Sequence, residues 1–134
     1  KYFFKKELIK PTKIYVKEVL KLIDKNLING CANITGGGLA DNIQRVIPDN
    51  FTAEINLDLI KTSKIFKWLH TEGISDKEML KTFNCGVGFC LIINSKKLNQ
   101  IKSYFTSDYE PYVIGKITKN FKEKVKLNGS FNWI

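Results

Sequence analysis

Three consecutive glycines form the part of the sequence that is best suited to binding chemistry. They follow an apolar run that ends at Ile34, and they precede a segment starting at Leu39 whose apolar residues recur at helical spacing. A strand, a glycine-rich turn and a helix in this order present free backbone N–H groups and a positive dipole end to an anion. Because glycine has no Cβ, a phosphate can approach the backbone closely. The sequence is therefore consistent with either a ligand-binding corner or a structural turn, formed by Thr35, Gly36, Gly37 and Gly38.

Polar residues around the glycines could extend such a site. Thr35 supplies a hydroxyl, and Asn42 could reach over the first turn of the expected helix. Asp41 would repel an anion there, but its carboxylate could instead accept hydrogen bonds from ribose hydroxyls. Arg45, the single arginine among 22 basic residues, lies in the same segment. The loop matches neither of the standard glycine-rich nucleotide motifs, GxGxxG and the P-loop.

A second candidate is the stretch TFNCGVG at residues 82–88, where a short helix is expected to end and a strand to begin. Asn84 is polar there, and the two glycines at 86 and 88 free the backbone. The alternative is a helix C-cap with a tight entry into a buried strand, which the local pattern favours. Cys85 could be a nucleophile, although a buried structural thiol is the interpretation that its surroundings favour.

The composition fits a single soluble globular domain, with 43% hydrophobic and 12% aromatic residues. No apolar run approaches the roughly 18 residues that a membrane-spanning helix needs. The net charge of +9 comes almost entirely from scattered lysines, which favours a solvated surface over a nucleic-acid or membrane partner. Three cysteines and one histidine match neither a disulfide framework nor a zinc site. We therefore expect no metal site and a cytoplasmic location.

Hydrophobic periodicity predicts alternating helices and strands. Helices are expected at about 19–27, 39–47, 63–70, 75–83 (with Ser75 and Glu78 as a capping box) and 95–105 (with Ser95 as its N-cap). Strands are expected at 14–16, 31–35, 51–59, 89–93 and 112–118, and the apolar run at 89–93 is typical of a central strand. Asn128-Gly129 predicts a hairpin that joins 125–127 to 131–133. The alternation predicts a sheet with helices on at least one face.

The segment from Ile34 to Pro48 resembles a stretch of a known enzyme family. ITGGG followed by Asn42-Ile43, Arg45-Val46 and Pro48 is similar to ITGGG…ENIPRVLP of aminoimidazole ribonucleotide synthetase, also called phosphoribosylformylglycinamidine cyclo-ligase. The next segment of that family is matched in the same order by Phe66, Trp68-Leu69, Gly73, Glu78-Met79 and TFNCGVG. PTKIYVK at 11–17 resembles the entry to the same domain. The resemblance is strong over about residues 8–93. In the remaining residues only the order of the expected elements is similar.

The resemblance implies an α/β (α+β) fold with a mixed, largely antiparallel and partly ferredoxin-like sheet flanked by helices. Residues 1–13 would be the lead-in from a preceding ATP-binding domain, and 14–134 would be a single C-terminal, substrate-side domain. The start without Met agrees with a longer polypeptide. ATP and Mg²⁺ would be bound mainly by the preceding domain. The implied partners are a small ribonucleotide substrate, the preceding domain and, for the full-length enzyme, a second subunit in a homodimer.

The reaction that the resemblance implies is an ATP-dependent ring closure in purine biosynthesis. It converts formylglycinamidine ribonucleotide to aminoimidazole ribonucleotide, and this fragment alone is expected to be inactive. Three related ATP-dependent families share the architecture: formylglycinamidine ribonucleotide synthetase, selenophosphate synthetase and thiamine monophosphate kinase. The TFNCGVG match disfavours them. A basic nucleic-acid-binding module is a further alternative, but the scattered lysines and the lack of an aromatic RNA-binding motif argue against it.

By the same resemblance, the substrate-binding residues are expected to be Thr35, Gly36, Gly37 and Gly38, which would hold the phosphate or ribose, with Asn42 in support. Asn84 and Gly86 are expected to line the same cleft. The chain departs from the family at three positions, with Asn33 for His, Asp41 for Glu and Gln44 for Pro. Asp41 keeps the negative charge, whereas Asn33 lacks a titratable group. No catalytic acid or base is therefore assigned.

Overall fold

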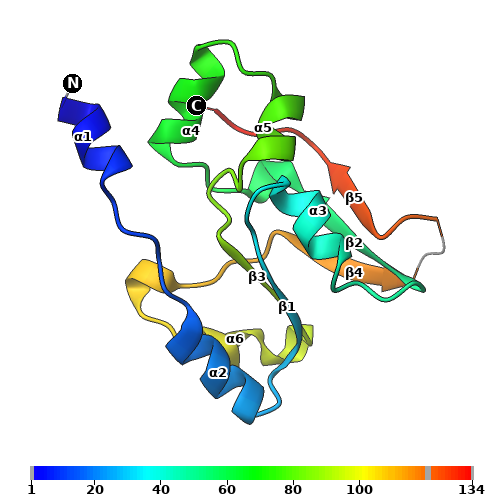
Figure 1. Ribbon diagram of the computed structural model, residues 1–134. Helices are drawn as coiled ribbons and strands as arrows, with labels where there is room; N and C mark the ends of the chain where they lie inside the picture. Colours follow the sequence, from blue (N-terminus) through cyan, green and yellow to red (C-terminus); the bar gives the residue numbers. More distant parts are fainter. Residues whose placement is uncertain (1, 120–121, 134) are drawn as a thin grey trace.

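The computed structural model describes residues 2–119 and 122–133, and it arranges them as helices around two small sheets (Figure 1). The helices are α1 (Tyr2–Leu8), α2 (Val16–Asp24), α3 (Gly38–Gln44), α4 (Lys64–Thr71), α5 (Asp76–Thr82) and α6 (Leu98–Lys102). The strands are β1 (Ile28–Asn33), β2 (Phe51–Asn56), β3 (Phe89–Ile93), β4 (Gly115–Lys119) and β5 (Val125–Asn128). Short 3₁₀ turns lie at Leu57–Leu59, Ser95–Lys97 and Ser107–Tyr109.

The described strands form one two-stranded and one three-stranded sheet. β1 and β3 pair antiparallel, with Asn33 opposite Phe89, and the register shifts between Ile28 and Gly30. In the other sheet β2 is central, with β4 antiparallel on one side and β5 parallel on the other. This mixed, largely antiparallel arrangement with flanking helices confirms the predicted fold class.

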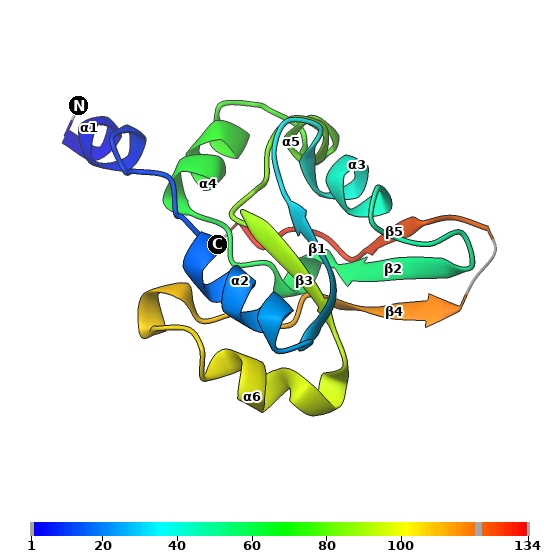
Figure 2. The same ribbon diagram turned by 60° about the horizontal axis from the view of Figure 1, so that its bottom comes forward.

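The β1–β3 ribbon separates two hydrophobic cores. The larger core lies against α3, α5 and the three-stranded sheet, and it receives Cys90 and Ile92 from β3. The smaller core is built on Leu22 of α2, Leu27 and Ile101 of α6, and it receives Leu91 and Ile93. Figure 2 shows α2 and α6 next to each other on this second side of the ribbon. Because successive side chains of a strand point to opposite faces, a strand between two cores must be apolar throughout.

This arrangement explains the continuous apolar run at 89–93, but the expectation of a central strand was wrong. Among the described residues, β3 pairs only with β1, so its other edge carries no strand. The apolar run arises from burial of both faces of the strand rather than from a neighbour on each side. Burial of side chains and pairing of strand edges are separate constraints, and only side-chain burial can be predicted from the hydrophobic pattern.

Side-chain capping decides where two of the helices begin. Ser75 accepts a hydrogen bond from the Glu78 backbone N–H (3.3 Å), which confirms its role as the N-cap of α5. The Glu78 carboxylate instead accepts a hydrogen bond from the Thr82 hydroxyl (3.2 Å), so the reciprocal half of the capping box does not form. After β3 the cap is Asn94 rather than Ser95, because the Asn94 side chain accepts from the Lys96 N–H (3.0 Å).

The expected strand at 14–16 was wrong, because α2 begins at Val16 and Tyr15 is its N-cap residue. The Tyr15 side chain leaves the helix and packs against the rings of Phe89 and Tyr109. Other elements are shorter than expected. β2 ends at Asn56, and the backbone continues as a 3₁₀ turn.

The expected C-terminal hairpin was also wrong. β5 pairs parallel with β2 instead of turning back on the following residues. The Asp58 carboxylate accepts a hydrogen bond from the Ser130 N–H (3.2 Å), and Gly129 has a φ of +73° beside it. This turn directs Phe131 into the larger core, where only 6% of its surface is exposed. The gain from burying an aromatic side chain outweighs the local hairpin preference of Asn-Gly.

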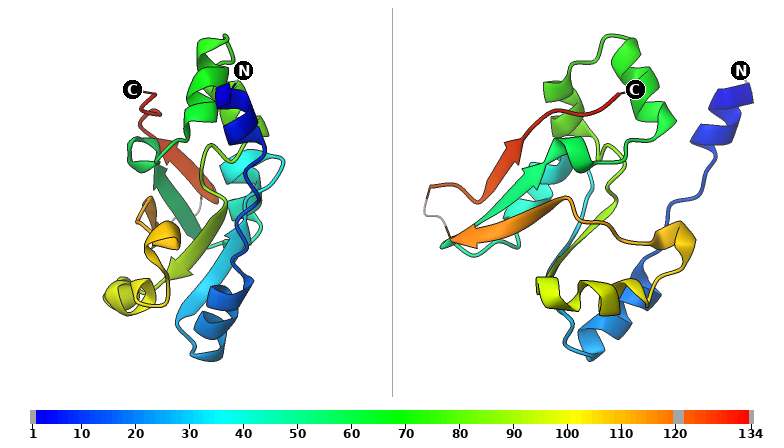
Figure 3. Two further views of the ribbon diagram at one scale, coloured as in Figure 1. Left: turned by 90° about the vertical axis from the view of Figure 1, so that its left-hand side faces the viewer. Right: turned by 180° about the vertical axis from the view of Figure 1, so that it is seen from behind.

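The end of the chain is held against α4 and α5, as seen from behind in Figure 3. The Trp133 ring stacks on His70 with centroids 4.9 Å apart, and its Nε1–H donates to Asp76 Oδ1 at 2.8 Å. His70 Nδ1 lies 3.3 Å from the same carboxylate oxygen. None of the helices that the structure describes is long and apolar enough to cross a membrane.

The packing of Phe131 can be tested by truncation. Phe131→Ala is expected to lower the free energy of unfolding by about 3–5 kcal/mol, the usual cost of removing a buried aromatic side chain. Val113→Ala, at a side chain that is 53% exposed, is the control and should change it by less than about 0.5 kcal/mol. Urea denaturation of the chain measures both, and equal effects would mean that Phe131 is not part of the core.

Candidate functional site

The two sequence motifs lie at the same end of the β1–β3 ribbon. The glycine loop follows β1, and the TFNCGVG stretch precedes β3, so antiparallel pairing brings the two together. The Ile34 N–H donates to the Gly88 carbonyl at 3.0 Å, which extends the pairing beyond the strands. Gly38 also packs directly on α5, since a Cβ at this position would lie 1.8 Å from the Leu80 carbonyl oxygen. The fold therefore makes neighbours of two motifs that lie more than 40 residues apart in the sequence.

Two successive residues of the glycine loop have left-handed backbone conformations. Gly37 has a φ of +96° and Gly38 a φ of +70°, values that favour glycine. The Gly38 N–H donates to the Thr35 carbonyl at 3.1 Å, which closes the turn. Gly36 is exposed, and a Cβ built on it would meet no atom within 4 Å. Gly37 and Gly38 are thus required by the turn, whereas Gly36 faces open space.

The Asn42 side chain holds the loop from the inside. Its amide nitrogen donates to the carbonyls of Gly38 (2.7 Å) and Thr35 (3.3 Å), with a longer contact to the Gly36 carbonyl (3.5 Å). Its Oδ1 accepts a hydrogen bond from the Thr35 hydroxyl (3.2 Å). Only 5% of the Asn42 surface is exposed. Its polar atoms are therefore used within the loop itself.

This arrangement also determines where the loop amides point. In a trans peptide the C=O group and the N–H group of the next residue point in opposite directions. Because the carbonyls of Thr35 and Gly36 face Asn42, the N–H groups of Gly36 and Gly37 face away from it. The described part of the chain offers these two N–H groups no hydrogen-bond acceptor. The loop can therefore donate two backbone hydrogen bonds to an acceptor outside the protein.

Asp41 lies in the first turn of α3, and Arg45 is its C-cap residue. Asp41 is exposed beside the loop, with one carboxylate oxygen 2.9 Å from the Cβ position of Gly37 and the other accepting from Gln44 (3.3 Å). This places an acceptor next to the outward amides, a combination that suits a ligand with both hydroxyl and anionic groups. Arg45 directly follows the last residue of α3, at the end of the helix away from the glycine loop.

The TFNCGVG stretch forms a tight turn, as its local pattern favoured. Asn84 Oδ1 accepts from the Gly86 N–H (3.0 Å), and the Asn84 carbonyl accepts from the Val87 N–H (2.9 Å). Gly86 has a φ of +103°, and a Cβ there would lie 2.7 Å from the Lys61 carbonyl oxygen. The Asn84 side chain thus shapes the turn, and the position of Gly86 requires glycine for steric reasons.

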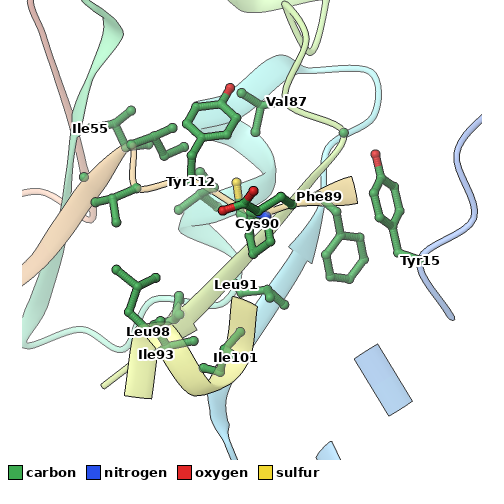
Figure 4. A pocket seen from close by; sticks show the side chains of 18 of the residues that line it. Tyr15, Ile55, Val87, Phe89, Cys90, Leu91, Ile93, Leu98, Ile101 and Tyr112 are labelled. Carbon is green, nitrogen blue, oxygen red and sulfur yellow. The ribbon is translucent and has the colours of Figure 1, made fainter. Parts of the chain in front are cut away.

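A cavity of about 300 Å³ lies along the open edge of β3 (Figure 4). Its walls come from β3, the β2–β4 pair, α6 and the segment 108–114, and Gly86, Val87 and Gly88 lie at one end. The lining is mostly apolar, with Leu91, Leu98 and Tyr112 among the labelled side chains in Figure 4. The residues of the glycine loop do not line it. The expected shared cleft is therefore represented by Gly86 alone, and the assignment of Thr35–Gly38 and Asn84 to the substrate remains a prediction.

Sequence reasoning did not identify this cavity. Its lining residues come from segments far apart in the chain, and most are apolar residues typical of a core. Charged side chains (Lys13, Glu54, Asp108, Glu110 and Lys116) and tyrosines also line it, but nothing in their local sequence distinguishes them. The apolar run at 89–93 was the only signal, and a fully packed strand would show the same pattern.

The buried cysteines are structural. Cys85 is fully buried, and its thiol lies 3.5 Å from the Met79 carbonyl oxygen, to which it donates. Burial, with a smaller contribution from the Asp76 charge, raises the pKa of Cys85 to about 11. Burial also raises the pKa of Cys90, to about 12. Both remain neutral thiols near pH 7, so the structural interpretation of Cys85 is confirmed. The described residues contain no group of three or more His, Cys, Asp or Glu side chains that could hold a metal ion.

Comparison with known proteins identifies the family. Residues 4–128 match the family described as AIR synthase related protein, C-terminal domain. The chain belongs to this family. It is 39% identical over 128 residues to a phosphoribosylformylglycinamidine cyclo-ligase of Lactobacillus helveticus (strain DPC 4571), a match that covers 92% of this chain and 37% of that protein.

Two further relatives show the same relationship. The chain is 42% identical over 115 residues to a chloroplastic phosphoribosylformylglycinamidine cyclo-ligase of Arabidopsis thaliana, covering 82% of the chain and 29% of the relative. It is 46% identical over 116 residues to the trifunctional purine biosynthetic protein adenosine-3 of Chironomus tentans, covering 85% of the chain and 8% of that protein. The chain thus spans about a third of the cyclo-ligases that it matches. The resemblance read from the glycine loop and TFNCGVG is confirmed at the level of this C-terminal domain family.

The steric requirements of this family's glycine loop can be tested by two matched substitutions. Gly38→Ala introduces a Cβ into the Leu80 carbonyl at a positive φ, and it should lower the free energy of unfolding by about 2–5 kcal/mol. Gly36→Ala places the same methyl group in open space and should change it by less than about 1 kcal/mol. Chemical denaturation measures both variants, and similar values for the two would contradict the packing of Gly38 on α5.

The buried Cys85 thiol predicts a pH dependence of stability. The pKa of Cys85 is about 11 in the folded chain and ordinarily 9.0, so above pH 9 the unfolded state loses this proton first. The unfolded state then binds fewer protons, and stability falls between pH 9 and 11. Cys85→Ser removes the titrating group and should make the fall less steep. Guanidinium denaturation under reducing conditions at pH 7.5, 9 and 10.5 measures this, and equal slopes for both proteins would rule out the effect.

Proposed function

We propose that this chain is the C-terminal, substrate-side domain of an ATP-dependent cyclo-ligase. The full-length enzyme would convert formylglycinamidine ribonucleotide to aminoimidazole ribonucleotide in de novo purine biosynthesis. The proposal is supported by relatives named phosphoribosylformylglycinamidine cyclo-ligase and by the trifunctional protein. These proteins match most of this chain at 37–46% identity. The observation that carries it is the glycine loop, whose carbonyls are held by Asn42 so that two free amides face outward.

In this proposal the loop binds a sugar phosphate. The outward N–H groups of Gly36 and Gly37 donate to phosphate oxygens, and the Thr35 hydroxyl borders them. The Asp41 carboxylate accepts from ribose hydroxyls, which would place the sugar next to the first turn of α3. Asn42 acts through the backbone, because its own polar atoms are used within the loop. Asn84 acts in the same indirect way, by shaping the turn that contains Gly86.

The chemistry of ring closure requires little covalent participation from these residues. ATP phosphorylates the amide oxygen of the substrate, and a substrate nitrogen then attacks the activated carbon and releases phosphate. Holding the substrate by its phosphate and ribose fixes the reacting atoms relative to each other, which supplies a large part of such rate enhancements. Burial keeps the Cys85 and Cys90 thiols neutral near pH 7, so neither is proposed as a nucleophile, and we assign no proton transfer to any residue of this chain.

ATP and Mg²⁺ are assigned to the domain that precedes this one in the proposed enzyme. The outward amides of the glycine loop suit a phosphate of either the substrate or ATP. The described residues offer no cluster of carboxylates that suits Mg²⁺, so we assign no Mg²⁺ ligand to this chain. The proposed partners are this preceding domain and, in the full-length enzyme, a second subunit. The fragment by itself would therefore be inactive.

The test uses two variants of the full-length enzyme that differ by one charge. Gly36→Asp and Gly36→Asn add side chains of the same size at a position with free space. A carboxylate within about 4–5 Å of a bound phosphate should raise the KM for its ligand at least about tenfold. The neutral Asn variant should have a much smaller effect, and thermal unfolding should be the same for both variants. Measuring the KM for ATP and for the ribonucleotide separately identifies which phosphate the loop holds.

Two results would contradict the proposal at different points. If both variants kept the wild-type KM for both substrates, the loop would not be the phosphate site. If the folded wild-type enzyme released no ADP with formylglycinamidine ribonucleotide, the reaction itself would be wrong. Substrate-dependent ATPase activity with the substrates of the related synthetases or thiamine monophosphate kinase would then identify the correct family member.

A further inference from the structure

The outer face of α2 carries apolar side chains that nothing in the described chain covers. Val19 and Leu22 point into the protein and are 8% and 0% exposed. Val16, Leu20 and Ile23 recur at i, i+4 and i+7, and they are 60%, 53% and 47% exposed. At roughly 100° per residue, the five side chains form one apolar arc about 160° wide. The body of the protein covers only one half of this arc.

The open half of the arc continues into the lead-in segment. Ile14, just before α2, is 73% exposed, and we call Ile14, Val16, Leu20 and Ile23 the α2 stripe. Leu8 and Ile9 at the end of α1 are also largely exposed. Six of the ten large hydrophobic side chains that are exposed in the described chain therefore lie between residues 8 and 23. The other four, Val46, Leu59, Val113 and Ile117, come from separate segments.

The lead-in segment, residues 1–13, connects the α2 stripe to the polypeptide that would precede it. In Figures 1 and 2 and in the right panel of Figure 3, α1 stands clear of the other elements, and an extended segment joins it to α2. The chain meets the body of the protein at Lys13, whose Nζ donates to the Asp108 carbonyl at 2.8 Å, and at Tyr15. Polypeptide upstream of α1 would thus be connected to the α2 stripe through this extended segment.

We propose that the α2 stripe is the docking surface for the preceding domain of the same polypeptide. This inference rests on the proposed function, which makes the chain the C-terminal part of a longer enzyme. The chain covers only 29–37% of the cyclo-ligases that it matches, and its family is defined as a C-terminal domain. Most of such a protein therefore joins this chain on the α1 side. Asp24, Lys17 and Lys21 lie beside the stripe on α2 and carry charges of both signs, so the partner surface is apolar with a polar rim.

The size of the stripe favours a tethered partner over a second copy of this chain. A stable interface between separate molecules buries about 800 Å² on each side. Four aliphatic side chains provide only part of that area. A domain on the same polypeptide binds at a high effective concentration, so a smaller apolar contact is sufficient.

The test compares the same substitutions in two contexts. Leu20→Gln/Ile23→Gln makes the stripe polar while keeping residues with good helix propensity. Leu59→Gln/Val113→Gln is the matched control, with side chains that are 48% and 53% exposed on other segments. In the full-length enzyme the stripe variant should lower the Tm by at least about 5 °C, since buried aliphatic side chains are lost from an interface. It should also accelerate tryptic cleavage after Lys13 at least about tenfold.

In the 134-residue chain alone, both double variants should leave the Tm within about 1 °C of wild type. The same large shift in both contexts would show that the stripe belongs to this domain's own core, and no shift in either would show that it is an open surface. Both results overturn the proposal. Loss of a concentration-dependent dimer of the 134-residue chain on sedimentation would also overturn it, in favour of self-association. None of these measurements uses activity, so failure of the proposed reaction would be recognised separately.

Discussion

The hydrogen bonds from the Asn42 amide to the carbonyls of its own loop are the interaction on which the candidate site depends. The Asn42 side chain is buried, and an unsatisfied amide in that position would cost about 1–3 kcal/mol. The consequence of these hydrogen bonds is directional. Once the carbonyls of Thr35 and Gly36 face inward, peptide geometry makes the following amides face outward. The same side chain thus stabilises the loop and determines which of its groups a ligand meets.

The position of this loop depends on the antiparallel pairing of β1 and β3. That pairing puts the end of β1 beside the start of β3, and therefore the glycine loop beside TFNCGVG. Gly38 packs so closely on α5, the helix that leads into TFNCGVG, that it cannot carry a side chain without displacing the Leu80 carbonyl. The glycines consequently have different reasons to be glycine. Position 38 requires glycine because of packing and of its positive φ, and position 37 requires glycine because of its positive φ. At position 36 glycine is required only if a ligand must approach the backbone closely.

The β1–β3 ribbon also connects the candidate site to the rest of the molecule. One face of β3 belongs to the core shared with α3 and α5, and the other belongs to the core shared with α2 and α6. α2 is therefore packed on this ribbon on its inner side, while its outer side carries the uncovered stripe. A domain docked on that stripe would contact a helix that packs on the same ribbon whose end carries the glycine loop.

Local patterns in the sequence determined much of this protein. The glycine loop with the following α3, the Ser75 cap and the two buried faces of the 89–93 run all depend on residues within a few positions of each other. Such features are visible because helical and strand periodicity and side-chain capping act over short distances. The family resemblance also came from two contiguous motifs, and it identified the domain correctly.

Only the tertiary structure decided the features that depend on distant partners. The hairpin that Asn128-Gly129 predicts does not form, because β5 pairs with β2, more than 70 residues earlier, and Phe131 packs in the larger core. The open edge of β3, the cavity beside it and the uncovered half of the α2 arc are likewise set by which segments pack together. A hydrophobic pattern predicts that a side chain is buried, but it does not predict which other residues the side chain packs against, because the hydrophobic effect is non-directional.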